Sequence, residues 1–370
     1  MENPLQSSPR PTLSATSSAP FHSRNAGDLY TLLILHCMVR CTYQQGGKDM
    51  SAKQYRTNTC VSAFDFFSRF PDQDTAQRHI EEIRWHGKPV CPYCGSEHVI
   101  FERKTSGRYY TCVNCRSRFT VRVGTVFERS HIPLHKWLYA IYLVMASRKG
   151  ISSVQLSKEL GITQKSAWFM LQRIRHALGG DDDDNSGIGA GGGLLKDIVE
   201  IDEAYFGGKD ENRHEYKRHN LGGADKTIVV GMRERGTGRT RGYVVGNTRS
   251  NTMTGLIFGT VATGSVICTD ESLSYTGIED DYIRRTVNHS AKQYVDGMAY
   301  TNGIESYWAT LKRGFYGIFH WFSVKHAQRY VDEFAFRMYE GSCKRHMYSR
   351  IESALMGTFG KRLTYRSLTA

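Results

Sequence analysis

The sequence lacks an apolar run long enough to cross a membrane. A membrane helix needs about 18 consecutive apolar residues, and the nearest candidate, residues 30–39, is shorter and is interrupted by His36. The first residues also lack the charged start, apolar stretch and small-residue cleavage site of a secretory signal in that order. We therefore expect an intracellular, cytoplasmic protein without a membrane partner.

A disulfide framework is also missing, although the chain has nine cysteines. Five are scattered, which suits reduced thiols. The other four form two C-x-x-C pairs separated by 17 residues, and they are Cys91, Cys94, Cys112 and Cys115. Two such knuckles suit tetrahedral zinc, since each tight turn offers two thiolates and the span between them can form a β-hairpin. The pattern predicts a structural Zn²⁺ site, and four unrelated buried cysteines are the alternative.

Acidic residues are fewer than basic ones, 36 against 49, so the formal net charge is +13 and the pI about 9.3. A basic chain attracts polyanions, because neutralising phosphates releases their counterions. Charge alone does not separate DNA from RNA or from an acidic membrane. The 40% of apolar residues is enough for ordinary cores in two or three domains.

The N-terminal part divides into two regions by composition. Residues 1–58 are rich in Ser, Pro, Gln, Gly and Lys and are expected to be a disordered extension, with Met50 as a candidate start. Residues 59–128 are expected to hold two short helices, separated at Pro71, and the zinc ribbon.

Residues 129–178 have the pattern of a helix-turn-helix DNA-binding region. Apolar spacing predicts a first helix, a second over residues 153–160 that starts after Ser152, and a third over residues 163–178. The outer face of the third helix is expected to carry the DNA-contacting candidates Lys165, Gln172 and Arg173, with Gln164 and His176 beside them. Helical hairpins with basic faces also occur in proteins that never bind DNA, which is the alternative.

A Gly- and Asp-rich linker, residues 179–195, precedes a region with a different pattern. Residues 196–342 predict strand, strand, strand, helix and strand, followed by further helices, which is the RNase H-like order of elements. The predicted fold class is α/β, with an RNase H-like core and a mixed sheet preceded by the zinc ribbon and the helix-turn-helix. Residues 343–370 are expected to be a basic C-terminal tail.

Three acidic residues in this region have the arrangement of a two-metal centre that cuts phosphodiesters. Asp202 and Asp270 follow strand-like runs, whereas Glu305 lies in a segment with helical spacing. The predicted topology sets the first aspartate on strand one beside the second on strand four. Carboxylates that converge in this way can hold Mg²⁺ or Mn²⁺, which activate a water and stabilise the departing oxygen. Each carboxylate alone could equally be a loop or helix-capping residue.

Helix and strand periodicity also predict the faces on which two neighbouring residues lie. Lys312 lies seven residues, or two helical turns, after Glu305 and should share its face, where its charge can hold phosphates. Glu203 directly follows Asp202, so on an extended strand it should point to the opposite face.

Several segments resemble bacterial insertion-sequence transposases of the ISXO-like kind. They are IDEAYFGGK, TVNHSAKQYVDG, TNGIESYWATLKRGFYGIFHWFS and KHAQRYVDEFAFR. The resemblance runs from about Phe64 to about Tyr339 and implies a zinc ribbon followed by an RNase H-like DDE core. It also implies that Asp202, Asp270 and Glu305 are the first, second and third metal-binding carboxylates, with Lys312 as a helper cation. Some relatives carry Asn or His at the third position, where this chain has Glu.

The resemblance further implies a DNA transposase that cuts at the ends of an insertion sequence and joins them to target DNA by metal-dependent transesterification. Its partners would be the terminal inverted repeats, target DNA and at least one further copy of the chain, at the nucleoid if the source is bacterial. Two alternatives stay open. One is a transposase-derived DNA-binding protein without cleavage, and the other is an RNase H-like nuclease without strand transfer.

Overall fold

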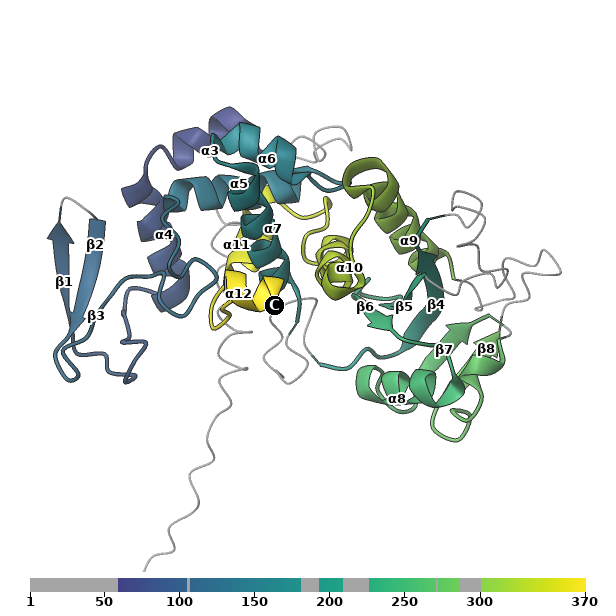
Figure 1. The fold of residues 1–370 in the computed structure, drawn as a ribbon. Helices are drawn as coiled ribbons and strands as arrows, with labels where there is room; N and C mark the ends of the chain where they lie inside the picture. The colour runs from purple at the N-terminus through teal and green to yellow at the C-terminus, as the bar shows by residue number, and fades with distance from the viewer. Residues whose placement is uncertain (1–58, 105–106, 181–192, 209–225, 271, 287–300) are drawn as a thin grey trace, which may run out of the picture. The chain divides into compact units, whose positions relative to one another are not determined.

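A computed structural model describes residues 59–104, 107–180, 193–208, 226–270, 272–286 and 301–370 (Figure 1). The expected N-terminal extension, the candidate start Met50 and most of the Gly- and Asp-rich linker lie outside the described residues. Within the described part of the chain, no helix combines the length and the apolar character that a membrane crossing requires.

The first two helices are α3 (Ala63–Arg69) and α4 (Gln73–Trp85). They are separated at Pro71, as predicted. Asp72 caps α4, and its side chain accepts a 2.8 Å hydrogen bond from the backbone N–H of Thr75. A short acidic residue in this place satisfies one of the free N–H groups at a helix start.

The zinc-ribbon region forms a three-stranded antiparallel sheet in the order β1-β2-β3. Its strands are Val99–Lys104, Gly107–Cys112 and Arg118–Phe119. The predicted hairpin between the two cysteine pairs is therefore confirmed. Trp85 of α4 packs edge-on against Tyr110 of β2, with ring centroids 5.1 Å apart, and so anchors the sheet to the helix.

The three helices expected in residues 129–178 are α5 (Leu134–Ala146), α6 (Ser153–Leu160) and α7 (Gln164–Leu178). Ser152 caps α6, and its hydroxyl accepts a 3.1 Å bond from the N–H three residues on. Gly161 ends α6 in the left-handed conformation, with φ 59°, which a residue without Cβ adopts easily. The helix-turn-helix order and the start of α6 after Ser152 are confirmed.

The C-terminal segment, residues 343–370, is folded and is not the expected tail. It forms α11 (Met347–Met356) and α12 (Tyr365–Thr369). Ile351 and Leu355 of α11 are buried in the same core as α4, α5 and α7. Basic composition predicted a solvated tail, but the apolar residues four apart cover one side of a helix and dominate its packing.

A five-stranded mixed sheet lies between the linker and the C-terminal segment. Its elements, in chain order, are β4 (Ile198–Phe206), β5 (Thr227–Glu234), β6 (Thr240–Val245), α8 (Ser250–Thr260), β7 (Val266–Thr269), the 3₁₀ turn η3 (Leu273–Tyr275), β8 (Ile283–Thr286), α9 (Asn302–Gly314), the π-helical turn η4 (Phe315–Phe319) and α10 (Val324–Met338). The strand order is β6-β5-β4-β7-β8. β5 runs antiparallel to both of its neighbours, β4 and β6, whereas β7 and β8 run parallel to β4. This confirms the predicted α/β, RNase H-like core.

The two faces of β4 pack against different helices. Ala204 and Phe206 share a core with α9 and α10, whereas Val199 and Ile201 share one with α8. Gly231, opposite Asp202 on β5, lets α9 approach closely, because a Cβ there would lie 2.6 Å from the ring of Trp308. The face of the sheet that carries Asp202 is therefore the face covered by α9 (Figure 1).

Candidate zinc site and candidate active site

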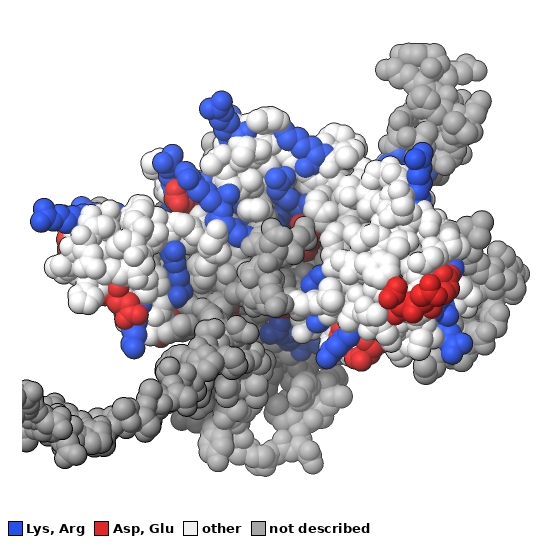
Figure 2. Space-filling view, turned by 90° about the horizontal axis from the view of Figure 1, so that it is seen from below, with Lys and Arg blue, Asp and Glu red and all other residues white. Residues whose placement is uncertain are grey.

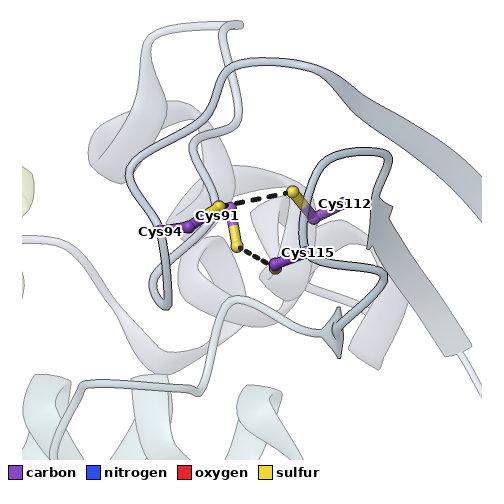
Figure 3. A group of neighbouring side chains, drawn as sticks. All are labelled: Cys91, Cys94, Cys112 and Cys115. Carbon is purple, nitrogen blue, oxygen red and sulfur yellow. Dashed lines mark hydrogen bonds between the residues drawn. The ribbon is translucent and has the colours of Figure 1, made fainter.

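The four cysteines of the zinc ribbon come together as predicted (Figure 3). The sulfurs of Cys91 and Cys115 lie 3.6 Å apart, as do those of Cys94 and Cys112, and all four lie within 4.8 Å of one another. Tetrahedral zinc with bonds of about 2.3 Å requires sulfur separations of about 3.8 Å. The four thiols therefore have the chemistry and spacing of a structural Zn²⁺ site.

Local hydrogen bonds favour the thiolate form in the second knuckle. The hydroxyl and the backbone N–H of Ser117 lower the pKa of the Cys115 thiol to about 6. The backbone N–H of Cys115 likewise lowers the pKa of Cys112. Since the thiolate is the form that binds metal, the backbone of this turn prepares two of the four ligands.

The proposed carboxylates of the catalytic centre lie at three adjoining elements. Asp202 is in β4, and Asp270 directly follows β7, the parallel neighbour of β4. The two aspartates are in register, because Glu200, two residues before Asp202, pairs with Cys268, two residues before Asp270. Glu305 lies in the first turn of α9, which covers the Asp202 face of the sheet.

Asp202 is held by two hydrogen bonds. The indole Nε1–H of Trp308 donates to Oδ2 over 3.0 Å, and the backbone N–H of Glu203 donates to Oδ1 over 2.8 Å. These bonds fix the carboxylate's orientation, and each oxygen keeps further lone pairs free to accept. The arrangement matches the way a metal-ligating carboxylate is oriented by groups behind it.

The charges of Asp270 and Glu305 reach the carboxyl group of Asp202. Burial raises the pKa of Asp202 above its ordinary value, the bonds from Glu203 and Trp308 oppose this, and the charges of Asp270 and Glu305 raise it further. Among the described residues, the cysteine cluster alone brings three or more potential ligand atoms within 4.8 Å of one another. The carboxylates are therefore more open than the cysteines. A cation would offset their mutual repulsion, and an all-oxygen set suits hard cations such as Mg²⁺.

Glu203 points to the other face of the sheet, as the strand alternation predicted. Its cross-strand partner Val230 belongs to the core under α8, which also contains Tyr275. Burial raises the pKa of Glu203 to about 7, the Tyr275 hydroxyl lowers it, and the charges of Asp270 and Asp202 raise it.

Lys312 and Glu305 are both exposed on α9. Their separation of seven residues places them on one side of the helix, about 10 Å apart along its axis. Tyr316 follows on this side, with 58% of its surface exposed. A phosphate backbone bound along this side would meet Lys312 after passing Glu305.

The prediction that Lys165, Gln172 and Arg173 lie on the outer face of α7 is wrong for the last two residues. Gln172 is fully buried and Arg173 is 7% exposed. The Gln172 amide donates to the Tyr330 hydroxyl over 3.4 Å, and Arg173 Nε donates to the Leu363 carbonyl over 3.0 Å. Later parts of the chain cover this side of α7, so these two polar residues serve packing contacts that the local pattern does not show.

Lys165 is exposed near the start of α7, as expected, with its ammonium 4.9 Å from the ring centroid of Tyr365. Gln164 beside it is exposed as well. The accessible polar side chains of α7 are thus near its N-terminus, the part of a recognition helix that reaches base edges.

Two residues in contact with this group were not singled out from the sequence: Trp308, which bonds to Asp202, and Glu200, which accepts a hydrogen bond from the backbone N–H of Ile304 in α9. Trp308 fits the apolar stripe of α9 and so was indistinguishable from an ordinary core residue. Glu200 precedes Asp202 by two residues, and the period of two in a strand places both on one face. The alternation along the strand could have placed Glu200 on the face of Asp202. Its contact with α9 depends on the tertiary fold and could not be predicted from that pattern.

Comparison with known proteins agrees with this architecture. The family described as the ISXO2-like transposase domain matches residues 194–338, and the transposase zinc-ribbon domain matches residues 71–118. A protein of Halobacterium salinarum, described as an uncharacterized protein in transposable element ISH50, is 28% identical over 259 residues, which are 66% of this chain and 83% of the relative. Transposase domains of this kind imply DNA as a partner. The chain therefore carries two domains of insertion-sequence transposases, a transposase zinc ribbon and an ISXO2-like transposase domain.

Proposed function

We propose that this transposase cuts DNA at the ends of an insertion sequence and joins those ends to target DNA, with Asp202, Asp270 and Glu305 as ligands of two divalent cations, Mg²⁺ or Mn²⁺. The observation that carries the proposal is the convergence of these carboxylates from β4, β7 and α9, strong enough for two of the charges to raise the pKa of Asp202.

Such cations, when bound, supply activation of the attacking oxygen and stabilisation of the leaving oxygen in an in-line displacement. Asp202 presents a carboxylate that Trp308 keeps in one orientation. Lys312 holds the DNA backbone beside the carboxylates by its charge. In the proposed reaction the carboxylates act as cation ligands: a water first cuts the strand and leaves a 3′-hydroxyl, which then attacks a target phosphodiester and displaces its 3′ oxygen.

DNA recognition is proposed for the zinc ribbon and the helix-turn-helix, which would bind the terminal inverted repeats. Lys165 and Gln164 at the start of α7 are the candidates for contact with DNA. Figure 2 shows Lys and Arg side chains spread over much of one face, with acidic side chains gathered in a few patches. Pairing both ends of an element requires at least two protomers, so we propose a homo-oligomer on DNA.

The test compares wild type with Asp202→Asn and Asp270→Asn in strand transfer of a pre-cleaved end with Mg²⁺. Both changes keep the side-chain shape and remove a charge, so joining should be abolished while binding to the element's end persists. Wild-type joining in either variant would remove that residue from the centre. With an uncleaved end as a second substrate, cleavage without joining by the wild type would favour an RNase H-like nuclease, and binding without either reaction would favour a DNA-binding protein.

A further inference from the structure

The side of β4 that faces α9 carries two carboxylates, and each of them binds the helix. Glu200 Oε2 accepts a 2.9 Å hydrogen bond from the backbone N–H of Ile304, and Asp202 Oδ2 accepts the 3.0 Å bond from Trp308. The acceptor residues are two apart on a strand, about 6.6 Å. The donor residues are four apart on a helix, about 6 Å. Both bonds can therefore form together when α9 lies along β4 in this one register.

Glu200 replaces the missing cap of α9. Thr301, at the N-cap position, makes no side-chain capping bond, and Glu200 reaches the free N–H of the first turn from the sheet. A carboxylate is favoured there because the helix N-terminus is partially positive. The approach is close, since a Cβ at Gly303 would lie 2.6 Å from Glu200 Oε2.

Glu200 is itself held in place from the sheet side. It is 1% exposed, and its Oε1 pairs with Arg235 Nε at 3.0 Å. Both of its oxygens are therefore occupied, one by the helix and one by the guanidinium. A buried carboxylate with both oxygens bonded is costly to disturb, because any unpaired charge remains desolvated.

We propose that Glu200, together with Trp308, is a positioning residue that sets the register of α9 on β4 and thereby the placement of the Glu305 carboxylate opposite Asp202. The inference rests on the proposed function of these carboxylates. A slip of one residue would move Glu305 by about 1.5 Å along the helix and about 100° around it. A misplacement of about 1 Å can cost about 100-fold in rate.

The test variant is Glu200→Gln. Glutamine keeps the shape, but its amide N–H₂ must face either Arg235 or the Ile304 N–H, and both are donors. The matched control is Glu234→Gln on β5. Glu234 is also 1% exposed, lies 3.9 Å from Arg239, and accepts a 3.0 Å bond from the Lys196 N–H, away from α9.

Four quantities separate positioning from general stability: the joining rate at saturating DNA, the Kd for a duplex carrying the terminal repeat, the Mg²⁺ concentration for half-maximal joining, and hydrogen exchange at the Ile304 amide. Glu200→Gln should lower the joining rate about tenfold or more, raise the Mg²⁺ requirement and speed exchange at Ile304, with the Kd within about twofold of wild type. Glu234→Gln should keep the joining rate, the Mg²⁺ requirement and the Ile304 exchange near wild type, even where its Tm falls equally.

Equal joining and equal Ile304 exchange in the two variants would overturn the proposal. If Glu200→Gln does not fold, Trp308→Phe removes the second bond but keeps an aromatic ring, and wild-type joining by that variant would overturn it instead. Asp202→Asn, run alongside, separates the two hypotheses. Wild-type joining by Asp202→Asn would refute the proposed catalytic centre, whereas hydrogen exchange at Ile304 would still report whether Glu200 holds α9.

Discussion

A buried ion triad joins the helix-turn-helix to the transposase domain, and its removal gives a large predicted effect. Glu333 of α10 is 1% exposed and binds Arg175 of α7, with Nε–Oε2 at 2.6 Å, and also Arg337 one turn further along α10. Arg175 is 2% exposed, and its guanidinium carbon also lies 3.9 Å from the ring centroid of Tyr330. Glu333→Gln would leave two arginines poorly paired in a place that water does not reach.

Removing one partner of a buried ion pair costs about 3–5 kcal/mol in the free energy of unfolding. For a protein of this size the expected fall in Tm is on the order of 10 °C. Thermal and urea unfolding at pH 7 measure the change. Glu82→Gln, which alters an exposed carboxylate on α4, is the control and should stay within about 0.5 kcal/mol of wild type.

The same triad predicts a pH dependence. Burial works to raise the pKa of Glu333, but the charges of Arg175 and Arg337 outweigh it and hold the pKa below its ordinary value of 4.5. A carboxyl with a lowered folded-state pKa stabilises the fold above the unfolded value and loses that contribution as pH falls through the folded one. The difference in stability between wild type and Glu333→Gln should therefore shrink below pH 4.5. A destabilisation under about 1 kcal/mol at pH 7, or a difference that grows on acidification, would show that the charge of Glu333 does not hold the two arginines in place.

Three further predictions concern other parts of the chain. Purified protein should carry one zinc per chain, and Cys112→Ser should release it, because three thiolates leave the tetrahedral site open; zinc retention by the variant, measured by metal analysis, would argue against this ligand set. Burial and the charge of Arg69 lower the pKa of His79 to about 4, so the wild type should lose stability as pH falls from about 6.5 to 4, whereas His79→Gln should show a flatter profile in the same unfolding series. Lys165→Ala should weaken binding to all DNA sequences and reduce the salt dependence of binding by about one ion, whereas Gln172→Ala should lower Tm. Weaker DNA binding by Gln172→Ala together with wild-type binding by Lys165→Ala would instead place the DNA contact on the buried side of α7.

Local sequence patterns predicted the elements that local physics controls. Ser152 marked a helix start because a short polar side chain satisfies free N–H groups there. Alternation along β4 separated Asp202 from Glu203 because a strand turns successive side chains to opposite faces. The paired cysteines indicated a four-thiol cluster because their spacing fits a metal knuckle.

The features that local patterns missed all depend on contacts between distant segments. Gln172 and Arg173 looked solvent-facing on a helical projection, but Tyr330 and Leu363, more than 150 residues later, cover them. The positioning role inferred for Glu200 likewise requires knowing that α9 begins above it.

The proposed centre requires the carboxylate of Glu305 on α9 to act together with those of Asp202 and Asp270, and the decisive variant is Glu305→Gln. The measurement is the rate of joining of a pre-cleaved end with Mg²⁺ at saturating DNA, with binding measured on the same protein. Gln keeps the shape and removes the charge, so joining should collapse while the Kd for DNA stays within about twofold of wild type. Joining at the wild-type rate would show that Glu305 is not the third ligand of the proposed centre.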